Sequence, residues 1–153
     1  MTIPGGYIAG DVLTAANLNL APAGTQGGGY AQRTTSQASI TSMVDIASLT
    51  VTFTAVAGRR YKATVMFHWE QTVADGAFFV YINDTVSNLM RFTVDEAANR
   101  PQGKMFAYAN LTSITGVKTW KVRCERDSGT ASGTFFGAAT YPAFISIEDI
   151  GQI

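Results

Sequence analysis

The sequence predicts an all-β protein, an antiparallel β-sandwich of jelly-roll type that follows a short N-terminal helical docking arm. After residue 29, apolar and polar residues alternate with a period of two over long stretches. Turn-forming pairs separate these stretches, and no segment beyond the arm has the periodicity of a long helix. About nine strands at such spacing are typical of sandwiches and jelly rolls.

The arm comes first, at residues 1–20. Asp11 or Thr14 can cap a helix there, and the residues that follow are compatible with about two helical turns. So short a helix is marginal in water, and it must pack either on its own β-domain or on a partner. A Gly-rich tether, residues 21–29, then leads to the β-domain, residues 30–153. The apolar groups available for docking are Tyr7, Ile8, Val12, Leu13 and Leu18.

Alternation within the β-domain predicts which side chains point into the core. In each of three stretches, 49–54, 61–70 and 118–126, every second residue is apolar and the others are mostly polar. The residues expected inward are Leu49, Val51, Phe53, Tyr61, Ala63, Val65, Phe67, Trp69, Trp120, Val122 and Cys124. Turns are expected at Ala57-Gly58, Asp75-Gly76, Asn83-Asp84, Thr115-Gly116, Ser128-Gly129 and Tyr141-Pro142.

Three segments, 77–82, 86–94 and 105–111, are apolar on both faces. A strand that is buried on both faces of a two-layer sandwich needs a third layer, and a neighbouring subunit can supply it. Each aromatic buried in this way contributes about 1.5–3 kcal/mol, so we predict a homo-oligomer. The alternative is that these strands cross the core of a monomer. The candidate interface residues are Phe78, Phe79, Tyr81, Met90, Phe92, Phe106 and Tyr108.

The composition restricts the partners. The chain has 153 residues, with 11 basic and 11 acidic residues that cancel, and only 14% are charged, against an average of about 25%. Without a positive field, neither nucleic acid nor an acidic membrane is an expected partner. No apolar run approaches the ~20 residues that span a bilayer. Cys124 is the only cysteine, so no internal disulfide is expected.

No pattern in the sequence indicates catalysis, a cofactor or a metal. His68 is the only histidine, and with Glu70 it makes an incomplete catalytic or metal-ligating set. A phosphate-binding loop and a nucleophile elbow are both lacking from the sequence. The carboxylates that glycoside hydrolysis needs as a pair lie mostly in predicted turns. We therefore predict a protein that is not an enzyme and has no cofactor.

The sequence of the arm is similar to a segment of known proteins. Residues Tyr7 to Asn19 (YIAGDVLTAANLN) resemble a segment at the start of many virion proteins of tailed bacteriophages, especially those of actinobacteria. The resemblance continues in Ile40 to Tyr61 (ITSMVDIASLTVTFTAVAGRRY) and in Ile145 to Gly151 (ISIEDIG). It implies a virion structural protein, assembled in the bacterial cytoplasm, whose arm attaches a β-sandwich or fibre-like domain to the particle. Such domains are commonly trimers, so the resemblance also implies a homotrimer.

Two placements in a virion follow from this resemblance. The protein is either a capsid decoration or head-fibre protein whose arm binds the major capsid protein, or a tail-fibre, tail-tip or collar protein whose arm binds tail or baseplate proteins. A long fibre needs a coiled-coil or β-helical shaft, and the sequence has neither heptads nor repeats, which favours capsid decoration. A third hypothesis is a free lectin-like module that binds a host surface glycan through loops 72–76, 95–103 and 127–133.

Overall fold

The computed structural model describes residues 28–95, 99 and 101–152. The docking arm and residues 21–27 of the tether lie outside the described residues, and so do the predictions for the arm helix and its apolar docking groups. Within the described residues every regular element is a strand. The first strand starts at Gly29, which the sequence had placed in the tether.

Ten strands, one more than expected, make up the domain. Their bounds are Gly29–Arg33 (β1), Gln37–Ile40 (β2), Val44–Ala55 (β3), Arg59–Gln71 (β4), Phe78–Asn83 (β5), Asn88–Val94 (β6), Gln102–Ala109 (β7), Gly116–Arg126 (β8), Gly133–Phe136 (β9) and Ala143–Gln152 (β10). The two shortest strands, β2 and β9, have four residues each and pair with each other.

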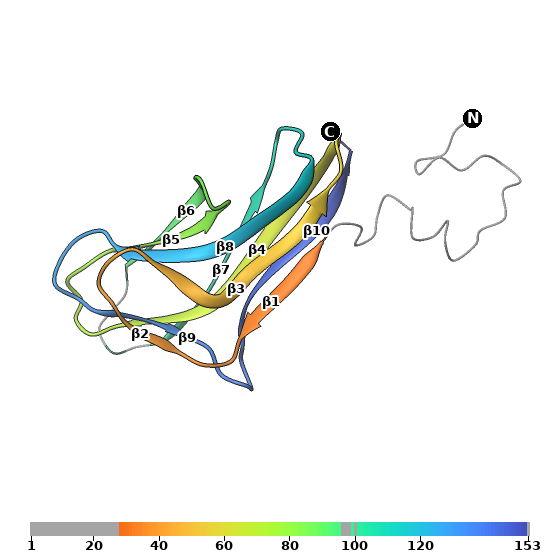
Figure 1. The fold of residues 1–153 in the computed structure, drawn as a ribbon. Coiled ribbons are helices and arrows are strands. Elements are labelled where there is room, and N and C mark those ends of the chain that lie inside the picture. The colour runs from red at the N-terminus through yellow and green to blue at the C-terminus, as the bar shows by residue number, and fades with distance from the viewer. Residues whose placement is uncertain (1–27, 96–98, 100, 153) are drawn as a thin grey trace, which may run out of the picture.

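The strands form two antiparallel sheets, which Figure 1 shows as two layers. Sheet A has six strands, in the order β1-β10-β4-β9-β2, with β7 on the opposite edge of β4. One edge of the long strand β4 serves two partners in turn, because β10 pairs with Arg59–Met66 and β9 with His68–Gln71. Sheet B has four strands, in the order β3-β8-β5-β6. These two sheets confirm the predicted all-β sandwich.

The core lies between the sheets, and the residues that fill it are those that the alternation predicted. All five predicted inward residues of β4 are fully buried, as are Val122 and Cys124 of β8. Aromatic rings pack together in the core: Phe67 stacks on Phe135 of the same sheet with 4.6 Å between ring centroids, and Trp69 lies 4.7 Å from Phe78 of the other sheet. The predicted orientation of these strands is therefore confirmed.

The predicted turns also fall where strands connect. The glycines of three of the predicted pairs, Gly58, Gly116 and Gly129, have φ near +77°, a backbone conformation that glycine adopts without strain. The turn after β5 is closed by Asp84, whose side chain accepts hydrogen bonds from the N–H groups of Val86 and Ser87. Short polar residues and glycine thus set the strand lengths locally.

Candidate functional site

The outer face of sheet A carries a continuous group of apolar side chains. On β4, Met66 points outward between two neighbours, because it pairs with Phe144 of β10 and with Met105 of β7. One step along, Tyr30 of β1 packs against Phe144 with 5.7 Å between ring centroids. We name this surface the apolar face and define it as Tyr30, Met66, Met105, Phe136, Tyr141 and Phe144.

Much of the apolar face is open to solvent in the isolated chain. Met105 is 66% exposed, Tyr30 58% and Tyr141 52%. These three side chains alone expose about 300 Å² of surface, on the scale of side-chain areas of 150–250 Å². Patches of that size on monomers are often functional, most commonly as contact sites for other proteins.

Two hollows shape the face. The larger, about 540 Å³, lies over the strands β4, β7 and β10 and is lined in part by Met105, Ala107 and Phe144. The smaller, about 190 Å³, is lined by His68, Pro101, Phe136 and Tyr141. The rings of His68 and Tyr141 meet edge to face there, with 5.3 Å between centroids. His68 therefore belongs to an aromatic surface.

Charged residues border the apolar face and leave its centre free. At one margin the Nζ atom of Lys62 lies 3.4 Å from a carboxylate oxygen of Glu148, and at the other margin stands Glu70. Between these two margins, the described outward residues of strands β1, β10, β4 and β7 are apolar, neutral polar or glycine, apart from His68. An apolar centre with a polar rim is the usual anatomy of a protein–protein interface.

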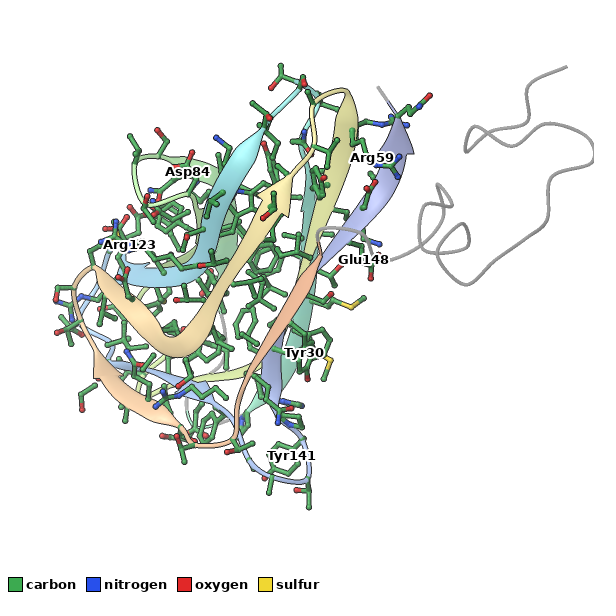
Figure 2. The ribbon with its side chains drawn as sticks, turned by 45° about the vertical axis from the view of Figure 1, so that its right-hand side comes forward. Tyr30, Arg59, Asp84, Arg123, Tyr141 and Glu148 are labelled. Atoms are coloured by element: carbon green, nitrogen blue, oxygen red, sulfur yellow. The ribbon has the colours of Figure 1, made fainter. Side chains whose placement is uncertain are left out.

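The outer face of sheet B is of the opposite kind. A carboxylate oxygen of Asp45 lies 2.7 Å from the ammonium of Lys121, and its other oxygen lies 2.7 Å from the guanidinium of Arg123. The guanidinium of Arg91 covers the ring of Phe79 at 4.4 Å from the centroid, a cation–π contact. Figure 2 shows Arg123 on one side of the sandwich and Tyr30 and Glu148 on the other.

Ionisation on sheet B follows from these contacts. Burial would raise the pKa of Asp45, but hydrogen bonds and ion pairs with Lys121 and Arg123 outweigh it, and the pKa is lowered. Burial and a hydrogen bond to Glu125 raise the pKa of Tyr81 to about 12. Asp45, Lys121, Arg123, Tyr81 and Glu125 on this face thus have charged or hydrogen-bonding partners within the chain.

The seven residues predicted for an oligomer interface separate into three groups. Phe78 is fully buried in the core. Phe79 and Tyr81 lie on the outer face of sheet B, beneath the charged residues just described. The other four lie on β6 and β7, the neighbouring edge strands of the two sheets. We name this group the apolar edge: Met90, Phe92, Phe106 and Tyr108.

The apolar edge is only partly covered within the chain. Phe92 stacks on Phe106 with 5.1 Å between centroids, and Tyr108 meets Trp120 edge to face. Phe106 is nearly buried, whereas Met90, Phe92 and Tyr108 keep intermediate exposure. The strands β6 and β7 each have one sheet partner, β5 and β4, so their other backbone edges are unpaired among the described strands.

Sequence reasoning missed the apolar face. Tyr30, Phe136 and Phe144 belong to strands that contribute one or two outward apolar residues each, so no single segment stood out. A signal existed in β4, where Met66 and His68 interrupt an otherwise polar outward row. Only the strand order, which places β10 and β7 beside β4 and β1 beside β10, brings these side chains together.

One end of the sandwich also exposes aliphatic side chains. A hydrogen bond of 2.9 Å from the Gly58 N–H to the Ser113 hydroxyl joins the β3–β4 turn to the β7–β8 loop there. A cavity of about 510 Å³ lies next to this loop, with Trp120 among its lining residues. We name the group the apolar end: Val56, Val86, Leu111, Val117 and Ile150, with Val86 88% and Leu111 81% exposed.

The described residues offer little for chemistry. Among them, no group of three or more histidine, cysteine or acidic residues is placed to hold a metal ion. Burial raises the pKa of the Cys124 thiol, which keeps it protonated and unreactive. Asp149, near the end of β10, is buried and forms an ion pair with Arg59, which is a structural use of a carboxylate. The described part of the chain has no helix of the length and hydropathy needed to cross a membrane.

Comparisons with known proteins find matches among solved structures only. No protein-family model matches the sequence, and no curated protein matches it either. Among solved structures, an Eiger TNF from S. frugiperda is similar with a TM-score of 0.40 and 7% identity, over 84% of this chain and 96% of that one.

Two structures of the VP2 protein of infectious bursal disease virus are also similar. A mutant VP2 in T=1 particles has a TM-score of 0.46 and 9% identity, over 99% of this chain and 42% of that one. A VP2 subviral particle has a TM-score of 0.42 and 8% identity, over 81% and 37%. The chain thus spans about two fifths of the length of these VP2 chains. At such scores the likenesses assign neither a family nor an activity.

Proposed function

We propose that the protein is a non-enzymatic structural protein of a bacteriophage virion, a short homotrimeric appendage on the particle surface. Capsid decoration or a head fibre is the favoured role. We further assign the sandwich to the jelly-roll type. Support for this assignment comes from the nested antiparallel pairs, in which β1 pairs with β10, β3 with β8, β4 with β7 and β5 with β6.

The observation that carries the proposal is the apolar end and its position relative to the arm. Strand β10 runs toward this end, since Gln152 pairs with Arg59 beside the β3–β4 turn. Strand β1 runs the other way, from Gly29 beside Ile147 to Arg33 beside Ala143. The described part of the chain therefore begins on the side of the apolar end. An arm and an apolar base on the same side suit a domain that is seated on a larger assembly.

The opposite end of the sandwich is more polar, as expected of a surface that faces the medium. Loops 72–76 and 127–133 meet there, and the Thr130 hydroxyl donates a hydrogen bond of 3.2 Å to the Asp75 carboxylate. The N–H of Ala131 also donates to the Asp75 carbonyl. These polar groups are engaged with one another, and this arrangement gives the free lectin-like module no specific support. Contact with a host through this end belongs to the tail-fibre, tail-tip or collar alternative.

Labelling of intact virions tests the proposal and separates the two placements. We expect an antibody against residues 30–153 to label the head under immunogold electron microscopy. Label confined to the tail tip or neck would replace capsid decoration by the tail alternative. Two negative results together would refute a virion protein altogether: no label on intact virions, and no band when the antibody is applied to the denatured proteins of those virions.

The arm has its own test. We expect a chain that lacks residues 1–20 to fold with an unchanged β-sheet circular dichroism spectrum, because the described sheets begin at Gly29. The same chain should not enter particles when it competes with the full-length chain in infected cells. Normal incorporation would show that the sandwich alone attaches the protein. Loss of folding would show that the arm packs on its own domain.

A further inference from the structure

We infer that the apolar face of one chain is covered by the apolar edge of a second copy, so that the chains associate head to tail in a closed ring. The inference deepens the proposed function, on which the number three rests. It assigns to the trimer two distinct surfaces, one a broad face on sheet A and the other the narrow β6/β7 side of the sandwich.

The first step is that both surfaces need a cover. The apolar face exposes an aromatic and methionine surface whose charged neighbours stand only at its margins. The apolar edge leaves Phe92 and Met90 partly open beside two unpaired strand edges. Natural proteins cover or charge such edges, because exposed ones promote aggregation. The outer face of sheet B carries charged side chains. The lack of charge at the centre of the apolar face is therefore a property of that face and not of the whole chain.

The second step is that a head-to-tail contact covers both surfaces at once. A twofold contact joins a surface to the same surface of the partner. A face-to-face dimer would leave both edges open, and an edge-to-edge dimer would leave both faces open. A head-to-tail contact places the edge of each chain on the face of the next, and a ring of such contacts leaves no copy uncovered.

The third step is that the shapes agree. Strands in a sheet lie about 4.8 Å apart and rise about 3.3 Å per residue. The four strands β1, β10, β4 and β7, over the rows from Lys62 to His68, therefore present a face of about 15 by 20 Å. The side of a sandwich is narrower, because its two sheets lie about 10 Å apart. The β6/β7 side thus fits within the face.

The exposed side chains of the apolar face supply part of the area that a stable interface needs. A stable interface buries about 800 Å² on each partner. The three most exposed side chains of the apolar face supply about 300 Å² of this, before the partly exposed Met66, Phe136 and Phe144 are added. Each chain in a ring uses two surfaces, so the total buried per chain is about twice that of one contact.

The decisive variants place a lysine on each surface of the full chain. Met105→Lys lies on the apolar face beside Met66, on an exposed side chain, so it leaves the core intact. Val117→Lys is the matched control, because Val117 is 72% exposed and lies on the apolar end. Sedimentation equilibrium measures the mass of each against the 16.3 kDa of one chain. We expect wild type and Val117→Lys to have three times this mass, and Met105→Lys to associate at least about 100-fold more weakly.

A second pair of variants tests the edge against the rival surface. Met90→Lys should weaken association as Met105→Lys does, because it places a charge on the apolar edge. The variant should still fold, since the lysine stem can lie along the apolar edge. If Met90→Lys fails to fold, the uncharged Met90→Gln at the same partly exposed position takes its place. Phe79→Ser removes the rival candidate on sheet B and should leave the trimer unchanged. Dissociation by Phe79→Ser, with Met105→Lys still trimeric, would overturn the inference.

Mixing the two dissociated variants tests the head-to-tail arrangement itself. The Met105→Lys chain keeps an intact edge, and the Met90→Lys chain keeps an intact face. We expect the mixture to form a one-to-one dimer that neither variant forms alone. Dimers of one variant alone, or no complex in the mixture, would overturn the head-to-tail pairing. A monomeric wild type would overturn both the inference and the trimer, whereas virion labelling would still decide the proposed structural role.

Discussion

Replacement of Trp120 by alanine should cost the domain about 4–5 kcal/mol of unfolding free energy. Trp120 is 2% exposed, and its indole meets two other rings edge to face, Phe53 at 5.0 Å and Tyr108 at 5.6 Å between centroids. Deletion of a buried tryptophan costs about 3–5 kcal/mol. Loss of two aromatic pairs, each worth about 0.5–1.5 kcal/mol, places this residue toward the upper limit.

Urea unfolding, followed by tryptophan fluorescence and circular dichroism, measures the effect. With a slope of about 2 kcal/mol per molar urea, the midpoint should fall by about 2 M. Both proteins must be compared at equal concentration, because association stabilises the folded chain. Val117→Ala, three residues earlier in β8 and largely exposed, is the control and should change the free energy by less than about 0.5 kcal/mol. A cost below about 1 kcal/mol for Trp120→Ala would refute the orientation of β8 and the position of the core.

Three further predictions concern single residues. Gly133→Ala should destabilise the fold by about 1–3 kcal/mol in the same urea assay, because a Cβ atom there would overlap the buried indole of Trp69; an unchanged midpoint would contradict this packing. Since the pKa of Tyr81 is raised to about 12, its contribution to stability should be complete below its unfolded pKa of about 10 and lost as the pH rises to about 12. Wild type should therefore lose more unfolding free energy over this range than Tyr81→Phe does, and parallel losses would refute the assignment. Cys124 should not react with a thiol reagent until the chain is unfolded in denaturant, and rapid reaction of the native protein would show that β8 is not buried.

The sequence predicted the core well, for a physical reason. Successive side chains of a strand point to opposite faces, so one buried residue sets the orientation of its whole strand. The five aromatic or aliphatic residues from Tyr61 to Trp69 had to share a side, and they are fully buried in the structure. Glycine at turns such as Gly58 and Gly116 then limited the strand lengths. These are local properties that the order of residues contains.

The outward surfaces could not be predicted in the same way, because they depend on which strands become neighbours. The apolar segment at 77–82 suggested burial by a second chain, yet Arg91 and Glu125 cover Phe79 and Tyr81 within the same chain. Conversely, Tyr30 and Met105 are 75 positions apart in the numbering and share a face only because β10 and β4 lie between β1 and β7. Periodicity records the face of a residue but not its lateral neighbours.

The few charged residues of the chain are distributed unevenly over its surface. Asp45, Lys121 and Arg123 form one cluster of ion pairs on sheet B, so the outer face of this sheet is charged where it meets the solvent. The apolar face, the apolar edge and the apolar end carry few charges and point in three different directions. A monomer with three such surfaces would associate without specificity, since each is large enough to attract any other. The proposed ring would leave one apolar surface per chain, at the end where β1 begins, and would place all copies of it on the same side. In the proposed trimer, that geometry would direct the remaining surface, threefold repeated, toward a single partner.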